Sequence, residues 1–302
     1  MTPKISVVIS AHNPRKDFFP KVLRGLERQT LANNDWELII VDNLSTEKLQ
    51  NIYKINWHPN HRFIVEENLG LAYARKRGFF EAKGDLLINV DDDIILDENY
   101  LKNAWNIYSR FPFLGVFGCQ IKPEFEIPPK LKIEYYGNAE RKVEKDIWSN
   151  NIKEYDSTPF GAGMCLRKEV YKEYLEVLET EDFRLQLGRR GKELLSCEDI
   201  DIVFFTCQMG LGKGMFKDLI ITHFVPETKM SVGYLIKNNY WNMYSATFQN
   251  YYLFGQVPNQ PSLKTIILRL LRIISMDGFK RKVEFAKIKG VKDALKKLKE
   301  AN

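Results

Sequence analysis

Short, almost wholly apolar runs alternate with amphipathic stretches over the first 120 residues. The apolar runs predict four buried β-strands, at Ile5–Ser10, Trp36–Val41, Arg62–Val65 and Leu86–Val90. The stretches between and after them predict helices at Phe18–Gln29, Thr46–Tyr53, Leu71–Ala82 and Tyr100–Tyr108. Strands that are apolar on both sides are typical of parallel sheets whose two faces are covered by helices. The pattern therefore predicts an α/β fold.

The pattern is less regular after residue 120. Lys122–Ser157 holds three prolines and clustered charges, which predicts a variable loop region. Order returns with a helix at Lys168–Leu178 and another that begins near Ser196. A further apolar run predicts a strand at Asp218–Ile221 that leaves His223 at its end.

Basic residues concentrate at the C-terminal end. The net charge is +6, but residues 261–302 carry twelve Lys or Arg against four Asp or Glu, which leaves −2 on the rest. Binding of nucleic acid needs a basic face on the folded body, and the sequence of the body shows none. We expect one domain over residues 1–260, in two halves at 1–120 and 121–260, followed by a basic helical tail at 261–302.

The composition is that of a folded globular protein, with 44% apolar and 28% charged residues in a chain of 302. No apolar run approaches the roughly 18 residues that a membrane-spanning helix needs, and the N-terminal residues lack the pattern of a signal peptide. The four cysteines form no C-x-x-C pair. We therefore expect a cytoplasmic protein with free thiols.

Three consecutive carboxylates, Asp91, Asp92 and Asp93, follow the strand predicted at Leu86–Val90. Ligands of open α/β sheets bind beyond the carboxyl ends of the strands. Carboxylates this close repel one another unless a cation or hydrogen-bond donors balance their charge, and oxygen ligands suit Mg²⁺ or Mn²⁺. The alternative is that the aspartates cap the next helix or form a solvated turn.

The segment Asn68–Gly78 places a glycine before a helix and Arg75 in the early turns of that helix. Helix N–H groups and a guanidinium together favour a phosphate. The alternative is an exposed face whose cations serve solubility alone.

Five segments occur in the order seen in family 2 glycosyltransferases: Ile5–Asn13, Leu38–Ser45, Asn68–Gly78, the triple aspartate and Ser196–Asp201. Each segment alone is loose, but five in this order are specific. The chain resembles that family over about residues 4 to 245. The resemblance implies a GT-A fold, a Rossmann-like mixed sheet flanked by helices, whose amino-terminal half binds a nucleotide-sugar and whose carboxy-terminal half binds the acceptor.

The resemblance also implies roles for donor-site residues. Ala11 and His12 lie where the family packs its first loop against the nucleotide base, and Asp42 lies where a carboxylate accepts a hydrogen bond from uracil N3–H. That contact favours UDP over purine nucleotides, while GDP- and dTDP-sugars stay open as donors. Asp91 would hold the ribose or the donor sugar.

The resemblance implies a divalent metal, Mn²⁺ or Mg²⁺, that bridges the diphosphate. Asp93 corresponds to the family's metal ligand, and Asp92 could exchange roles with it. His223 matches a histidine that some members use on the metal or the diphosphate. A buried, hydrogen-bonded core histidine is the alternative.

Glu198 and Asp199 resemble the family's Glu-Asp pair at the start of an acceptor-side helix, where the aspartate is the general base. A base must reach the acceptor hydroxyl on the sugar face opposite the leaving nucleotide, and that geometry inverts the anomeric centre. The alternative is an acidic helix start that suits the helix dipole. Asp201 either supports the site or lies on the helix surface.

Two features bear on the acceptor. The Gln-x-x-Arg-Trp motif of processive synthases is absent from Asn238–Ser245, which favours single transfers. In the tail, Leu263–Ile274 is apolar on most faces and Lys280–Lys299 is basic, so the tail suits the interface of an anionic membrane. Packing of the tail on the body is the alternative.

We therefore expect a metal-dependent, inverting, non-processive glycosyltransferase that moves a sugar from a UDP-sugar to a saccharide or lipid-linked hydroxyl, with a peripheral position on the inner membrane face. Two alternatives stay open. A sugar nucleotidyltransferase would show a glycine-rich basic loop after the first strand, where this chain has Ala11–Arg15. A non-catalytic scaffold that binds nucleotide-sugars would be expected to lose the carboxylates.

Overall fold

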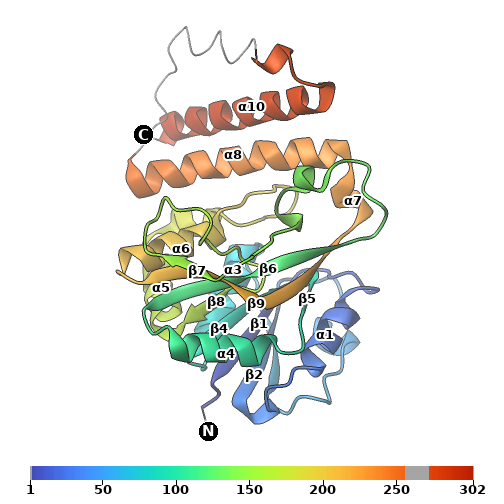
Figure 1. Cartoon of the computed structure of the whole chain (residues 1–302), viewed down its shortest axis with the longest axis vertical. Coiled ribbons are helices and arrows are strands. Elements are labelled where there is room, and N and C mark those ends of the chain that lie inside the picture. The colour runs from blue at the N-terminus through green and yellow to red at the C-terminus, as the bar shows by residue number, and fades with distance from the viewer. Residues whose placement is uncertain (1, 256–271, 302) are drawn as a thin grey trace. The chain divides into compact units, whose positions relative to one another are not determined.

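The structure is a computed structural model that describes residues 2–255 and 272–301. The chain separates into two compact units, Met1–Leu185 with Glu198–Val225 and Gln186–Cys197 with Pro226–Asn302 (Figure 1). The boundary expected at residue 260 and most of the helix expected at Leu263–Ile274 lie outside the described residues.

Four parallel strands form the first part of the sheet in the first unit, and they confirm the predicted strands. They are β1 (Ile5–Ala11), β2 (Trp36–Asp42), β3 (His61–Val65) and β4 (Leu86–Asp91). β1 pairs with β2 on one side and β4 on the other, and β2 pairs with β3. Every residue of β1 and β2 is buried, as their apolar runs predict. The carboxyl ends of these strands therefore meet at one edge.

The sheet continues past β4 with mixed pairing. β8 (Cys165–Arg167) is antiparallel to β4 and β6 (Leu114–Phe125), and β6 is parallel to β9 (Gly212–Val225). β5 (Ile94–Leu96) and β7 (Ile147–Ser149) both run antiparallel to β9. The order β3-β2-β1-β4-β8-β6-β9-β5, with β7 beside β9, confirms the mixed sheet that the sequence predicts.

Helices cover both faces of this sheet. They are α1 (Phe19–Glu27), α2 (Leu49–Ile52), α3 (Leu71–Glu81), α4 (Tyr100–Arg110), α5 (Lys168–Thr180) and α6 (Glu198–Gln208). Val7 and Ile9 of β1 join a core with residues of α1 and α4, whereas Val8 joins a second core with residues of α3, α5 and α6. Successive side chains of a strand point to opposite faces, so one strand serves two cores. The four cysteines are free, as expected.

The expected bounds of one loop region, one helix and one strand are wrong. The region Lys122–Ser157 is only partly loop, because β6 runs to Phe125, a 3₁₀ helix spans Ile133–Ala139 and β7 follows. The helix expected at Thr46–Tyr53 shortens to α2, since Asp42 holds the preceding loop through the N–H groups of Ser45 and Leu49.

The strand expected at Asp218–Ile221 is the later part of β9, so His223 lies within a strand rather than past its end. The start of β9, Gly212–Gly214, has little β-propensity of its own. Its central residue, Lys213, is fully buried and donates to the carbonyl of Glu154 and the hydroxyl of Thr158. Tertiary contacts therefore extend the strand beyond what its local sequence predicts.

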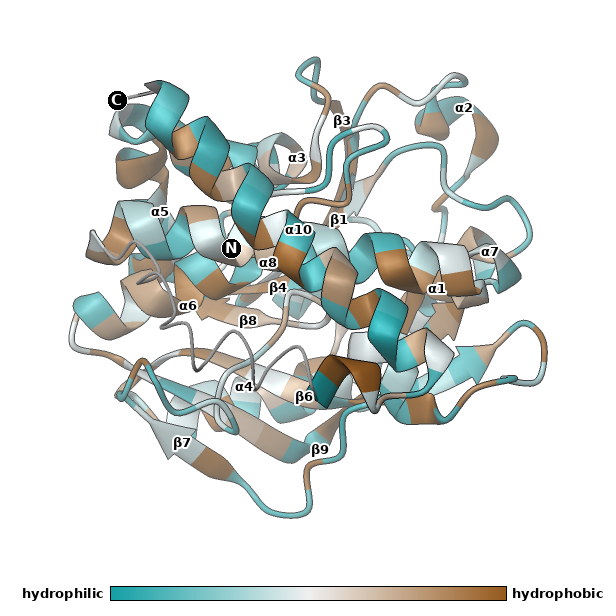
Figure 2. Ribbon diagram, turned by 90° about the horizontal axis from the view of Figure 1, so that it is seen from above, coloured by the Kyte–Doolittle hydropathy of each residue, from teal (hydrophilic) through white to brown (hydrophobic). Residues whose placement is uncertain are grey.

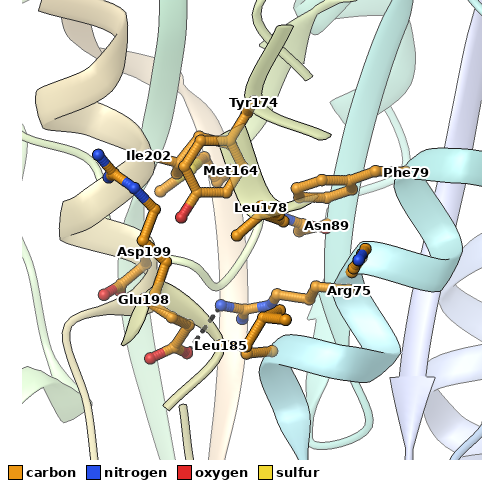
Figure 3. A pocket seen from close by; sticks show the side chains of 13 residues that line it. Arg75, Phe79, Asn89, Met164, Tyr174, Leu178, Leu185, Glu198, Asp199 and Ile202 are labelled. Atoms are coloured by element: carbon orange, nitrogen blue, oxygen red, sulfur yellow. Dashed lines mark hydrogen bonds and ion pairs between the residues drawn. The ribbon is translucent and has the colours of Figure 1, made fainter. Parts of the chain in front are cut away.

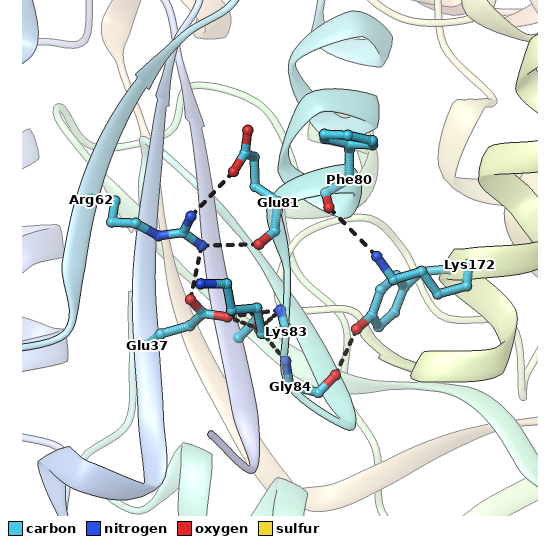
Figure 4. A network of polar contacts seen from close by, with 9 residues as sticks. Glu37, Arg62, Phe80, Glu81, Lys83, Gly84 and Lys172 are labelled. Carbon is cyan, nitrogen blue, oxygen red and sulfur yellow. Dashed lines mark hydrogen bonds and ion pairs between the residues drawn. The ribbon is translucent and has the colours of Figure 1, made fainter. Parts of the chain in front are cut away.

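A polar network fastens the end of α3 to the amino-terminal edge of the sheet (Figure 4). Arg62 donates to Glu37 at 2.9 Å and to Glu81 at 3.1 Å. The other oxygen of Glu37 accepts from the backbone N–H of Lys83 at 2.8 Å and from the hydroxyl of Ser6 at 2.7 Å. Each oxygen of this buried carboxylate thus has a donor, which is the condition for burying a charge at low cost.

The second unit holds α7 (Glu227–Met230), α8 (Val232–Phe254) and α10 (Gly278–Ala301). Ser231 caps the start of α8, because its hydroxyl accepts from the N–H of Tyr234 at 3.2 Å, and Gly255 caps the end in the left-handed conformation. α10 packs along α8 (Figures 1 and 2), and its Gly290 lies directly against the backbone of Tyr240. Within residues 2–255 and 272–301, we find no helix with the length and apolarity needed to cross a bilayer.

Candidate functional site

The loops after β2 and β3 are tied together by the side chain of Asn43, which is 3% exposed. Its Nδ2 donates to the carbonyls of Glu66 and Asn68 at 3.0 and 2.7 Å. Its Oδ1 accepts from the N–H of Gly70 at 2.8 Å, directly before α3. Asn43 thereby fixes the start of α3. Its residue type alone does not predict this role, and its place directly after Asp42 is the one signal in the sequence.

Ala11, His12 and Asp42 lie together at the carboxyl ends of β1 and β2. Ala11 and Asp42 are partners in the strand register, and Nδ1 of the exposed His12 is 2.6 Å from the carbonyl oxygen of Asn43. The carboxylate of Asp42 is 4% exposed and accepts two backbone N–H groups at 2.9 Å. Asp42 thus orders its own loop, and each of its oxygens has a second lone pair for a ligand N–H.

The two loops at this edge contain strained backbone. Asn13 has φ 49° and Leu44 has φ 57°, a region that favours glycine. The loops are also bonded to each other, because the N–H of Asn13 donates to Ser45 and its Oδ1 accepts from Thr46. Strain of this kind persists only where surrounding structure enforces it, and it clusters at ligand-binding loops.

Arg75 of α3 joins two acidic segments that are far apart in sequence. Its guanidinium is 3.0 Å from Asp91, at the end of β4. It is also 2.9 Å from Glu198, at the start of α6, and Figure 3 draws this second contact. Burial opposes the charge of this side chain, which is 8% exposed, but the carboxylates of Asp91, Glu198 and Asp199 outweigh burial and raise the pKa of Arg75. The alternative of an exposed solubility face is therefore wrong for Arg75.

Asp199 is held beside this cluster by backbone donors. Its Oδ2 accepts from the N–H of Gly161 at 2.8 Å, and its Oδ1 accepts from the N–H of Ile200 at 2.9 Å. Gly161 also allows the close approach of Arg75, because a Cβ at this position would lie 2.6 Å from Nη2 of the guanidinium. The Gly161–Gly163 turn therefore packs against both charged residues.

Asp201, one turn into α6, is fully buried. It accepts from the hydroxyl of Tyr174 and from Nη1 of Arg184, both at 2.6 Å. Asp201 therefore anchors α6 to α5 and to the segment after it. The alternative that it lies on the helix surface is wrong.

A pocket with about 370 Å³ of empty space, part of it open to solvent, lies among α3, α5 and α6 (Figure 3). Arg75, Glu198 and Asp199 form its charged wall. Its apolar wall includes Phe79, Met164, Leu178, Leu185 and Ile202. The expected general base therefore lines a concave site rather than an open surface.

The triple aspartate forms the turn from β4 into β5, and the next helix, α4, begins only at Tyr100. The helix-cap alternative is therefore wrong, whereas the aspartates do form a turn in which each is partly exposed, as the other alternative expects. Oδ2 of Asp93 lies 3.7 Å from Nε2 of His223, and each side chain is about one-fifth exposed, at 21% and 22%. His223 is the strand partner of Ile94 in the β5–β9 register. The structure thus brings Asp93 and His223 together beyond the carboxyl end of β4, and His223 is not a fully buried core residue.

Among the described residues, no group of three or more His, Cys, Asp or Glu side chains is arranged to hold a metal ion. Asp93 and His223 form a smaller set of one carboxylate and one imidazole. Mg²⁺ and Mn²⁺ bind enzymes through one or two protein ligands when water and substrate phosphates fill the other positions. The donor chemistry of this pair therefore fits such an ion.

Comparison with characterised proteins identifies relatives of the chain. The glucosyl-dolichyl phosphate glucuronosyltransferase of Haloferax volcanii is 20% identical over 80% of this chain and 76% of its own length. The validoxylamine A glucosyltransferase of Streptomyces hygroscopicus is 27% identical over 45% of this chain, and the match spans 34% of that protein.

Solved structures have the same fold. TarS 1–349 of S. aureus superposes with a TM-score of 0.53 both in complex with UDP and in complex with UDP-GlcNAc. The UDP complex is 14% identical and covers 99% of this chain and 92% of that chain; the UDP-GlcNAc complex is 13% identical and covers 96% and 89%. These likenesses show the GT-A fold. Residues 6–175, more than half of the chain, match the sequence profile of glycosyl transferase family 2. The chain therefore belongs to glycosyl transferase family 2.

Proposed function

We propose that this protein transfers a sugar from a UDP-sugar to a hydroxyl of a glycan or lipid-linked acceptor, with inversion, with a divalent metal and one sugar at a time. The observation that carries the proposal is the position of Arg75 between Asp91 and Glu198. Asp91 belongs to the expected donor side and Glu198 to the expected acceptor side. The contact of one guanidinium with both residues supports a single reacting centre between the two expected sides.

The donor would bind at the carboxyl ends of β1, β2 and β4. Ala11 and His12 would pack against the base, Asp42 would accept from it, and Asp91 would hold the ribose or the sugar. UDP and UDP-GlcNAc in complexes of the TarS fold relative support this choice of nucleotide. GDP- and dTDP-sugars are the alternatives that a donor panel would separate.

Asp93 and His223 would hold the divalent ion, with Asp92 as the alternative carboxylate. The ion would offset the charge that develops on the departing diphosphate. The turn from β4 into β5 fixes the backbone of Asp93, whose carbonyl accepts from the N–H of Phe224 at 2.8 Å. That bond keeps Asp93 beside His223.

Asp199 would take the acceptor proton. Glu198 is engaged by Arg75, whereas the carboxylate of Asp199 is oriented by two neutral backbone N–H groups and lines the pocket. We therefore assign Asp199 as the general base and Glu198 as a positioning residue. Attack from the side opposite the diphosphate inverts the anomeric centre without a covalent intermediate.

The acceptor class rests on the relatives. The name of the Haloferax volcanii relative describes an enzyme that acts on a dolichyl phosphate-linked sugar. A lipid-linked acceptor would bring this protein to the inner face of a membrane as a peripheral enzyme. The lack of the Gln-x-x-Arg-Trp motif at Asn238–Ser245 supports single transfers.

The test is UDP release from a panel of UDP-sugars with Mn²⁺ or Mg²⁺, by the wild type and by Asp199→Asn. Loss of a general base costs about 10²- to 10⁴-fold in rate, so we expect Asp199→Asn to bind UDP normally and release it at least 100-fold more slowly. Asp218→Asn, an exposed position in β9, is the matched control and should behave as wild type. Undiminished release by Asp199→Asn, or no binding of any nucleotide-sugar with either metal, would count against the proposal.

A further inference from the structure

One face of α10 presents a row of cations. Six exposed residues recur every three or four positions along the helix, and we call them the basic stripe: Lys282, Phe285, Lys289, Lys292, Lys296 and Lys299. At about 100° per residue these positions fall on one face of an α-helix. Gly290, Ala294 and Leu298, which are buried, fall on the opposite face. Most of the basic stripe therefore points away from the contact with α8, while Nζ of Lys289 lies 6.0 Å from the ring centroid of Tyr240 in α8.

The acidic residues of α10 leave most of the positive charge of the basic stripe unbalanced. Glu284 is 2.9 Å from Lys287, which is not part of the stripe. Asp293 accepts from the hydroxyl of Tyr240 in α8 at 3.0 Å. At the end of the helix, Glu300 lies 3.8 Å from Lys296. Most of the stripe thus keeps a net positive charge.

An aromatic side chain interrupts the row of cations. Phe285 is 50% exposed, between Lys282 and Lys289. Figure 2 shows hydrophobic residues between the hydrophilic ones along α10. An exposed phenylalanine among lysines is typical of helices that lie in a membrane interface, where the ring enters the acyl boundary and the lysines reach the headgroups. A duplex nucleic acid would contact the lysines but would gain little from the ring.

We propose that the basic stripe binds the anionic headgroups of a phospholipid bilayer, with α10 parallel to the surface and Phe285 inserted into the interface. The 24 residues of α10 span about 36 Å, which is long enough for all five lysines to reach headgroups at once. The biological purpose of this contact rests on the proposed action on a lipid-linked acceptor. The binding itself does not depend on catalysis.

The experiment is co-sedimentation of the full chain with vesicles of phosphatidylcholine alone and with 30 mole per cent phosphatidylglycerol. A stripe variant carries Lys282→Gln, Lys292→Gln and Lys299→Gln. A matched control carries Lys48→Gln, Lys102→Gln and Lys130→Gln, three exposed lysines of the first unit, so both variants lose the same net charge. Each lysine near an anionic surface contributes about 5-fold in binding, so the stripe variant should bind at least about 100-fold more weakly than wild type.

The control variant should bind within a few-fold of wild type, and Phe285→Ser should bind about 10-fold more weakly. Raising the salt to 0.5 M should release the wild type from the anionic vesicles, because salt screens headgroup charges. Equal loss in the stripe and control variants, or binding of wild type to duplex DNA but not to anionic vesicles, would overturn the proposal. Circular dichroism of each variant separates weak binding from unfolding.

A measurement of UDP release in solution without vesicles tests the proposed function separately from membrane binding. UDP release without vesicle binding overturns only the proposal that the basic stripe binds a membrane. Vesicle binding without release from any nucleotide-sugar overturns the proposed function alone.

Discussion

Arg75 keeps its charge inside the protein because two carboxylates reach its guanidinium from different segments. Its motif was visible in the sequence, and so were Asp91 and Glu198. That the three would meet was not visible, because the contact depends on how α3 and α6 pack on the sheet. The sequence therefore marks the three residues one by one, while their mutual contact is visible only in the structure, and a phosphate as ligand of Arg75 stays a prediction.

Removing the guanidinium should leave two facing carboxylates without a counter-charge. We expect Arg75→Met to lower the free energy of unfolding by about 3 kcal/mol, as breakage of a buried pair does, and to lower the rate of UDP release strongly. Arg75→Met with Glu198→Gln should recover part of the stability but not the rate. Urea unfolding and UDP release measure the two effects. Equal stability of Arg75→Met and wild type would contradict this picture.

Gly161 contacts both Arg75 and Asp199, and only a residue without a side chain fits beside the guanidinium. In Gly161→Ala the new Cβ would lie within 3.0 Å of three guanidinium atoms of Arg75, so we expect Arg75 to shift and UDP release to slow by about 10-fold or more. The control is Gly233→Ala in α8, because a Cβ at this position meets nothing within 4 Å. This substitution should stabilise the helix by up to about 1 kcal/mol. Steady-state rates on both variants test the difference. An unchanged rate in Gly161→Ala would refute a positioning role.

His58 makes the stability depend on pH. It is 1% exposed and stacks on Trp36 with ring centroids 3.8 Å apart, and its burial lowers its pKa from 6.5 to about 4. Between those values the unfolded chain binds the proton more readily than the folded protein, so the free energy of unfolding falls as the pH drops from 6.5 towards 4, by up to about 1.4 kcal/mol per pH unit.

His58→Phe keeps a ring against Trp36 and removes the titration. The difference in unfolding free energy, His58→Phe minus wild type, should therefore rise as the pH falls through this window. Denaturant unfolding at several pH values measures it. A difference that stays constant with pH would rule out His58 as the cause.

At the scale of elements, local pattern predicted the parallel strands well and the longer late elements poorly. The first strands are apolar throughout because helices bury both faces, so their pattern is unambiguous. α8 was not predicted: its aromatic residues, including Tyr240, Tyr244 and Phe248, have modest helix propensity. These rings lie in contact along one side of the helix, and the ring centroids of Tyr244 and Phe248 are 5.0 Å apart. Such packing cannot be inferred from local helix propensity.

The pairing of α8 with α10 depends on one glycine. A Cβ on Gly290 would collide with the carbonyl oxygen of Tyr240, and backbone cannot move aside as a flexible side chain does. Gly290→Leu should therefore separate the helices and lower the stability of the second unit by about 1–3 kcal/mol. Gly278→Ala, with nothing within 4 Å of its Cβ, should be neutral or stabilising. Hydrogen exchange of α10 amides measures the effect, and unchanged protection in Gly290→Leu would contradict it.

At the scale of the whole molecule, order along the chain predicted the family because each motif lies at a strand end or a helix start. A parallel sheet gathers the ends of β1, β2 and β4 at one edge, so that loops after different strands meet whatever their spacing in sequence. The division of the chain into two units is harder to predict from the sequence. Contacts place Gln186–Cys197 in the same unit as the residues from Pro226 on, and contacts between distant segments leave no trace in composition. The expected boundary at residue 260 stays a prediction.

The stereochemistry of transfer tests the central claim most directly. Proton NMR of the first product formed from an α-linked UDP-sugar reports the anomeric configuration before any equilibration. If Asp199 activates the acceptor on the face opposite the diphosphate, the new linkage will be β and Asp199→Asn will form it at least 100-fold more slowly. An α-linked product, or a β-linked product formed at an undiminished rate by Asp199→Asn, would contradict the mechanism.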